Sequence, residues 1–167
     1  MTMRPGARRA ALVLHVGCSV GWLGAVATSL AVAVIGMTGS DADAVRAAYL
    51  ILAPIGWYAL IPLSLASLAT GLVQSLGTGW GLLRHYWVVA KLLMNLLATG
   101  VLLLYCQTLD YLAGRARTAV TPAQTEQLRD PSPVVHGVAA VALLLVALVL
   151  SVYKPRGLTA YGQRRLG

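Results

Sequence analysis

The chain has 167 residues, of which 58% are hydrophobic and 11% are charged, with a mean hydropathy of +0.75. Because soluble domains carry roughly 25% charged residues, this composition excludes an ordinary soluble domain. The formal net charge of +8 invites a nucleic-acid interpretation, but the basic residues flank apolar segments instead of gathering in one patch. We therefore expect a partner in the lipid bilayer and no nucleic acid.

Segments long enough to span a membrane, which takes about 20 mainly apolar residues, lie at about residues 10–37, 47–76, 85–106 and 133–153. The first follows arginines as in a signal peptide, but it exceeds the roughly 7–15 residues of a signal h-region, so we expect an uncleaved span. In the second, Pro54 and Pro62 each remove a backbone donor and predict a kink. The sequence predicts an all-α fold, an integral membrane four-helix bundle in one domain, residues 1–167.

Helix-capping patterns mark the connection between the third and fourth spans, about residues 107–132. Thr121-Pro122-Ala123-Gln124 reads as a capping box, which predicts a short surface helix there. Ser132-Pro133 predicts an N-cap followed by proline at the first position of the fourth helix. Lys154-Pro155 predicts the end of that helix.

The basic residues also predict an orientation, because cytoplasmic connections of membrane proteins carry the excess of lysine and arginine. Four spans place both termini on one side, where eight basic residues gather: Arg4, Arg8, Arg9, Arg84, Lys154, Arg156, Arg164 and Arg165. The other side has four basic residues and all five acidic ones: Arg46, Arg115, Arg117 and Arg129, with Asp41, Asp43, Asp110, Glu126 and Asp130. We therefore expect both termini in the cytoplasm and the 107–132 connection outside it.

Polar and small residues recur every three or four positions, which places them on one face of each helix. The first span has His15, Ser19, Trp22, Val26, Ser29 and Ala33; the second has Trp57, Leu60, Ser64, Ser67, Gly71 and Ser75; the third has Arg84, Trp87, Lys91, Asn95, Leu102 and Tyr105. Since the apolar remainder of each helix meets lipid, we expect these stripes to face one another as a polar seam inside the bundle.

Lys91 lies about 9 Å deeper than His85 at 1.5 Å per residue, where a lysine costs roughly 2.5–3.5 kcal/mol. Two interpretations stay open. Lys91 either extends its ammonium toward the cytoplasmic surface or contacts Asn95, or it is a buried cation that meets an anion such as a carboxylate or propionate. The spans contain no acidic residue, so the second interpretation requires an anion from outside the chain.

The histidines are the candidate metal ligands. His15 faces the predicted seam, and imidazole is a common ligand of haem iron or copper. His85 shares a leaflet with His15, although it also fits an interfacial belt beside Trp87. His136 lies in the other leaflet. The sequence has no Ser-His-Asp, P-loop or H-E-x-x-H pattern that would indicate a hydrolase or an NTPase.

Two stretches carry a resemblance to known proteins. L-H-V-G-C-S-V-G-W-L-G, residues 14–24, and G-L-x-x-S-L-G-T-x-W-G-L-x-R-H-Y-W-V-V-A-K-L, residues 71–92, resemble a family of small four-span membrane proteins common in actinobacteria, catalogued as a domain of unknown function. The resemblance covers most of the chain. It implies a multi-pass protein of the bacterial inner membrane and brings no activity.

A more distant resemblance concerns the haem-binding, protoporphyrinogen oxidase-like membrane proteins. His15 with Trp22, and Trp87 with Lys91 and Leu92, match that family's patterns. The resemblance implies that His15 binds haem and that Lys91 is functional. The chain lacks the family's arginine after the first tryptophan, and Val101 and Leu102 replace its Tyr-His pair. These departures argue against porphyrinogen oxidation and leave a porphyrin or quinone pocket. The chain also loosely resembles copper-resistance D-like proteins.

Two hypotheses follow. In the first, the protein binds haem b or a quinone and acts in membrane redox chemistry. His15 is then an axial ligand, Lys91 neutralises a propionate or polarises a quinone carbonyl, Asn95 adds a polar contact, and Trp22, Trp57 and Trp87 wall the pocket. In the second, the protein is a non-enzymatic accessory or partner subunit, or a homo-oligomer, whose polar seam only holds the bundle together. A transporter is disfavoured because inverted repeats and intramembrane carboxylates are missing.

Overall fold

The computed structural model describes residues 3–78, 81–155 and 157–164. Trp80 of the second resemblance stretch, and Arg156 and Arg165 of the charge pattern, lie outside these ranges. In chain order the elements are α1 (Pro5–Thr38), α2 (Ala42–Ile55), the π-helix η1 (Gly56–Leu60), α3 (Ile61–Leu76), α4 (Tyr86–Thr118), α5 (Pro122–Glu126), α6 (Ser132–Tyr153) and α7 (Ala160–Arg164). The all-α fold is thus confirmed over the described residues, which contain no strand.

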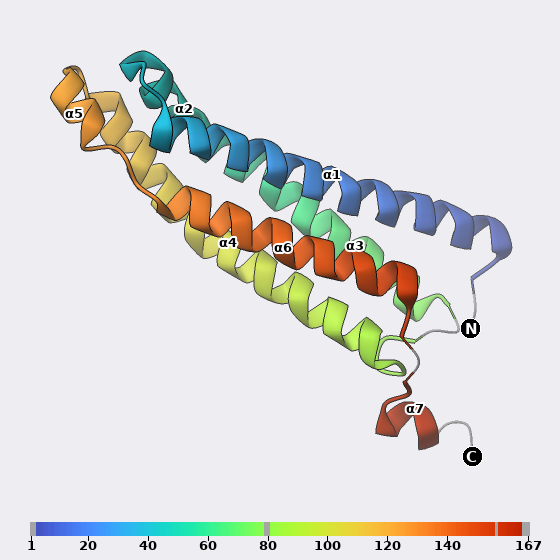
Figure 1. Ribbon diagram of the computed structural model, residues 1–167. Coiled ribbons are helices and arrows are strands. Elements are labelled where there is room, and N and C mark those ends of the chain that lie inside the picture. Colours follow the sequence, from blue (N-terminus) through green and yellow to red (C-terminus); the bar gives the residue numbers. More distant parts are fainter. Residues whose placement is uncertain (1–2, 79–80, 156, 165–167) are drawn as a thin grey trace.

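Four helices in the described part of the chain are long and apolar enough to cross a membrane: α1, the continuous helix α2–η1–α3 (Ala42–Leu76), α4 and α6. They run alternately up and down (Figure 1). Helix α1 packs against α2, α3 and α6, and α4 packs against the same three helices. Helices α1 and α4 are therefore diagonal in the bundle, separated by α3 on one side and α6 on the other.

The two proline residues of the second long helix flank a π-turn. Pro54 lies inside α2, Pro62 lies in the first turn of α3, and the Ile61 N–H donates to the carbonyl of Gly56, five residues back. A π-turn inserts one extra residue and rotates the helix face that precedes it by about 100° relative to an unbroken helix. Trp57 consequently leaves the polar stripe: it is 42% exposed and donates to Asp110 Oδ2 at 3.0 Å. The prediction that Trp57 walls the pocket is wrong.

At the π-turn the second long helix and α4 also approach each other closely. A Cβ on Gly56 would lie 3.1 Å from the Sγ of Cys106 and 3.2 Å from a methyl group of Leu109. Both neighbours belong to α4. Glycine therefore allows the second long helix and α4 to approach more closely than a larger side chain would permit.

The helix ends differ from the sequence prediction at two places. Helix α4 continues to Thr118 instead of ending near residue 106, because Leu109, Leu112 and Ala116 maintain a buried face against α2. The α6 N-cap is also displaced: Ser132 is the first helical residue, and its N–H donates to Asp130 Oδ1 at 2.7 Å. The Ser132 cap prediction is therefore wrong by one residue: the N-cap is Pro131, and the side chain of Asp130 accepts from the first helical N–H.

Two other predicted ends agree with the structure. The capping box of α5 is present, with Thr121 accepting from the Gln124 N–H and the Gln124 side chain accepting from the Thr121 N–H. Helix α6 ends at Tyr153, and Lys154 follows in the left-handed conformation with φ 43°. These ends were readable because the residues that determine them are neighbours in sequence.

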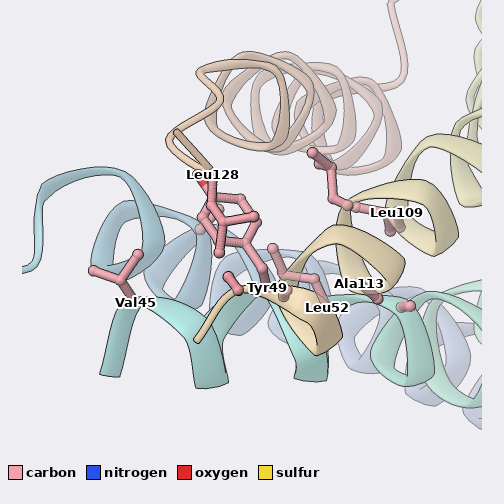
Figure 2. Packing of buried hydrophobic residues seen from close by; sticks show 11 residues of the cluster. Val45, Tyr49, Leu52, Leu109, Ala113 and Leu128 are labelled. Carbon is pink, nitrogen blue, oxygen red and sulfur yellow. The ribbon is translucent and has the colours of Figure 1, made fainter. Parts of the chain in front are cut away.

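The main hydrophobic core lies at the end of the bundle that carries α5, which we call the closed end. It is built by α1, α2, α4 and the α4–α6 connection, and its buried residues are Ala33, Val45, Tyr49, Leu52, Ala53, Leu109, Leu112, Ala113, Ala116, Ala119 and Leu128. Figure 2 shows Leu128 from the connection lying over Tyr49 and Leu52 of α2. This packing joins segments that are some 80 residues apart in the chain.

Hydrogen bonds to the backbone reinforce the closed end. The guanidinium of Arg129 donates to the carbonyls of Met37 at 2.6 Å and Gly39 at 2.8 Å, and it also contacts Glu126 at 2.8 Å. The Tyr49 hydroxyl accepts from the Asp130 N–H at 2.8 Å. These bonds attach the α4–α6 connection to the end of α1 and to α2.

Candidate functional site

The opposite end, which carries both described chain ends and which we call the open end, encloses a cavity of about 400 Å³ between α1, α3, α4 and α6. In Figure 1 the ribbons of α1 and α4 diverge toward this end. The cavity wall combines leucine, valine and Trp87 with these polar residues: His15, Ser19, Ser67, Gln74, Ser75, Thr78, Lys91, Asn95, Ser151 and Lys154. We call it the polar cavity.

His15 is held on α1 by a neighbour on α3. Its Nδ1 lies 3.1 Å from the hydroxyl oxygen of Thr70, and a Cβ on Gly71 would lie 3.1 Å from the imidazole Cε1. Thr70 has one hydroxyl hydrogen, and its nearest acceptor is the Ala66 carbonyl at 2.6 Å. The Thr70 oxygen therefore accepts from His15, so Nδ1 carries the proton in the neutral ring. Nε2 then keeps its lone pair.

Lys91 reaches α6 across the cavity. Its ammonium donates to the hydroxyl of Ser151, which in turn donates to the Ala147 carbonyl at 2.8 Å. The same ammonium lies 6.0 Å from the centre of the Trp87 ring, at the outer range of a cation–π contact. These contacts fix the position of the charge, but neither partner carries a negative charge.

A second lysine lines the polar cavity, and no acidic residue does. Lys154 follows α6 at the same end as Lys91. All five acidic side chains of the sequence lie in the segments 41–43 and 110–130, at or toward the closed end. The polar cavity therefore carries two positive charges with no carboxylate among its lining residues.

The deeper wall of the cavity is a chain of side-chain hydrogen bonds. Ser19 on α1 lies 2.9 Å from Ser67 on α3, the Asn95 amide donates to the Ser67 oxygen at 3.3 Å, and Thr99 donates to the Asn95 Oδ1 at 3.3 Å. Toward the opening, the Gln74 Oε1 is sealed from solvent and has no partner among the described residues. The polar side chains deep in the cavity therefore have hydrogen-bond partners, whereas Gln74 near the opening has a buried oxygen without one among the described residues.

The predicted site residues do not all lie together: four line the polar cavity, Trp22 lies in a separate apolar cluster, and His85 caps α4 outside the cavity. His15, Trp87, Lys91 and Asn95 line the polar cavity together. Trp22 lies one helical turn or more away, buried in a separate apolar cluster with Val26 and Leu60.

His85, the second proposed metal ligand, does not line the polar cavity. It is the N-cap of α4, pairs with Leu158 through a single β-bridge, and its ring lies edge-on to Trp87 at 6.4 Å between centroids. Among the described residues no three His, Cys, Asp or Glu side chains gather in a group that could hold a metal ion. His15 is thus the histidine of the polar cavity.

Sequence reasoning missed Thr70, Gln74 and Ser151, and it counted Lys154 only as a surface charge. Each is a polar residue within or next to an otherwise apolar helix, which was a usable signal. Their partners lie on other helices, and the pairing of Thr70 with His15 depends on the rotation of α1 relative to α3.

Comparisons with protein families, with characterised proteins and with solved structures gave no match to this chain.

Proposed function

We propose that the protein is a multi-pass protein of the bacterial inner membrane that binds haem b in the polar cavity and acts in membrane redox chemistry. The observation that carries this proposal is the combination of a histidine that donates through Nδ1, and so keeps a lone pair on Nε2, with the ammonium of Lys91, which donates to the uncharged hydroxyl of Ser151.

His15 has the arrangement that a metal-bound histidine needs. Histidine ligands almost always donate their second N–H to a fixed acceptor, which orients the ring and directs the other nitrogen at the metal. Thr70 supplies that acceptor. Because no set of three metal-binding side chains is present in the described part of the chain, the iron must bring its own equatorial ligands, as the iron of a haem does.

The two lysines favour a dianionic ligand. Haem b carries two propionates, which Lys91 and Lys154 would hold. A neutral quinone in the same cavity would bring no negative charge to the half-buried ammonium of Lys91, whose donor contact there is the uncharged Ser151 hydroxyl. Charge therefore favours haem over a quinone in the polar cavity.

The size and the wall of the cavity agree with this assignment. About 400 Å³ lies within the roughly 300–1,000 Å³ of ligand sites, and the apolar wall residues would contact the porphyrin faces. When bound, a haem with a histidine ligand supplies one-electron redox chemistry. The matches at His15, Trp22, Trp87 and Lys91 to the protoporphyrinogen oxidase-like pattern point the same way.

The proposed orientation places the open end in the cytoplasm, because basic residues gather there. Reporter fusions test it. A fluorescent protein fused after residue 164 should mature in the cytoplasm, whereas a periplasm-dependent phosphatase at the same position should stay inactive. The opposite pair of results contradicts the orientation.

Titration of the purified protein with haemin in mild detergent tests the binding site. We expect a sharp Soret band that saturates at one haem per chain and is lost in His15→Ala. His85→Ala is the matched control, since that histidine lies at the same end outside the cavity, and it should titrate like the wild type. Equal titration of wild type and His15→Ala would contradict the proposal and leave the seam a structural feature.

A further inference from the structure

A second cavity of about 270 Å³ lies between α1, α4 and α6, nearer the closed end, and shares no lining residue with the polar cavity. We call it the apolar cavity. Leucine, valine and alanine form most of its wall, and its lining includes no Lys, Arg, Asp or Glu. The groups able to hydrogen-bond belong to Trp22, Ser29, Tyr105 and His136. It can therefore accept a neutral molecule and would exclude a charged one.

Trp22 contributes a buried donor without an acceptor. The residue is 2% exposed, and its indole Nε1 has no hydrogen-bond partner among the described residues. Leaving such a group unpaired is unfavourable, and buried tryptophan N–H groups usually find a partner. This orphaned donor indicates that an acceptor from outside the chain completes the site.

His136 contributes an acceptor at the other side of the cavity. Its Nδ1 lies 2.9 Å from the Ser132 carbonyl, which can only accept, so Nδ1 carries the proton and Nε2 keeps its lone pair. The ring stacks on Tyr105 with 3.9 Å between centroids and 16° between planes, and the Tyr105 hydroxyl lies 2.9 Å from Ser132 Oγ. The orientation of His136 is thus fixed by two residues, Ser132 and Tyr105.

The apolar cavity opens sideways between α4 and α6. Leu97 and Val101 on the α4 side of its wall are 61% and 43% exposed, and Ala139 on α6 is exposed too. If these helices span the membrane as proposed above, this opening faces lipid. A ligand would then enter from the bilayer.

We propose that the apolar cavity binds a neutral, membrane-soluble compound of the quinone class. The Trp22 N–H donates to a carbonyl oxygen of the ligand, and His136 Nε2 accepts from a ligand hydroxyl in the hydroquinone form. The Trp22 nitrogen is covered, so a neighbouring side chain must move when the ligand enters. Leu102 and Leu144 both pack on the Trp22 cluster and line the cavity, and one of them changes rotamer. This inference rests on the proposed membrane placement and is independent of haem binding.

Ligand-dependent thermal unfolding in lipid nanodiscs tests the site, because a ligand that binds only the folded state raises the unfolding midpoint. In a Cys18→Ser background, which removes the partly exposed second thiol, reaction of a thiol-sensitive dye with Cys106, which is 0% exposed, reports unfolding. The two probes are decylubiquinone and 1-decyl-4,5-dimethoxy-2-methylbenzene, which carries the same substituents and lacks the two quinone carbonyl oxygens. In the wild type we expect decylubiquinone to bind about fivefold more tightly, as one hydrogen bond provides.

Trp22→Phe should bind both probes equally, because it keeps the ring and removes the N–H. Ala98→Leu and Ala140→Leu each fill the cavity from one side and should weaken both probes at least about tenfold. Ala69→Leu, on an exposed face of α3, should behave like the wild type. A wild type without preference, a preference kept in Trp22→Phe, or unchanged binding in both filled variants would each overturn the proposal. Loss of the Soret band in the haemin titration bears only on the polar cavity.

Discussion

At the closed end of the bundle Tyr49, Leu52 and Leu112 are each 1% exposed, whereas at the open end His15 and Lys91 line a cavity of about 400 Å³. The closed end uses its polar groups for structure, since Arg129 and Tyr49 bond to backbone groups of other elements. At the open end, by contrast, His15 keeps a lone pair on Nε2, and Lys91 donates to the uncharged hydroxyl of Ser151.

The difference shows how one bundle can combine a fixed scaffold with a site for a ligand. Four helices packed equally along their whole length would leave no space for a molecule of haem size. Here the closed end orders the helices, and the divergence of α1 and α4 leaves the cavity at the other end (Figure 1). Changes at the closed end should therefore affect unfolding, and changes at the open end should affect binding.

The largest effect on stability is expected for Leu112→Ala. Removing a buried leucine leaves a cavity in the core and should lower the free energy of unfolding by about 2–5 kcal/mol. Titration with SDS in mixed micelles measures this loss. Leu104→Ala, on the same helix but 71% exposed, should change the free energy by less than about 0.5 kcal/mol. Similar losses in the two variants would mean that the closed end is not the scaffold.

Arg129→Ala should have the next largest effect on stability. The free energy of unfolding should fall by about 2 kcal/mol, because charged hydrogen bonds to the Met37 and Gly39 carbonyls disappear. The same unfolding titration applies. Arg117→Ala is the control: it removes an exposed arginine near the end of α4 that makes none of these bonds. Haem binding should be unchanged in both variants. Weakened haem binding in Arg129→Ala would contradict the claim that changes at the closed end affect unfolding and not binding.

Thr70→Val should affect haem binding and leave the free energy of unfolding nearly unchanged. It removes the acceptor for His15 Nδ1 while keeping the side-chain shape, so haem affinity should fall by about tenfold or more with little change in unfolding. Thr28→Val is matched, because Thr28 makes only the local bond to the Gly24 carbonyl at 3.0 Å. Haemin titration compares them, and unchanged affinity in Thr70→Val would contradict the proposed histidine geometry.

The smallest effects concern the two lysines. Lys91→Met should weaken haem binding about tenfold and raise the stability of the haem-free protein, because it removes a charge from a helix that we propose to span the membrane. Lys154→Met should weaken binding by only about threefold, since Lys154 is exposed and its attraction to a propionate is screened. Haemin affinity and SDS unfolding are measured for both. A stronger effect at Lys154 than at Lys91 would contradict the assignment.

Features that depend on residues close together in the chain could be predicted from the sequence. Apolar length predicted the four long helices, and spacing placed His15, Lys91 and Asn95 toward a common interior. The α5 capping box was readable because Thr121 and Gln124 are three residues apart.

Features that depend on contacts between distant segments were not readable. The continuation of α4 to Thr118 follows from packing on α2, and the displacement of Trp57 follows from the π-turn. The pairing of Thr70 with His15 joins residues 55 positions apart. Each depends on how one helix is rotated against another, which the sequence of either helix does not determine.

The most direct test of the central claim is the absorption spectrum of the protein purified in mild detergent from cells supplied with haem, recorded oxidised and after reduction with dithionite. We expect a Soret band with reduced α and β bands in the wild type, lost in His15→Ala and retained in His85→Ala. A flat wild-type spectrum, or bands that persist in His15→Ala, would contradict haem binding in the polar cavity.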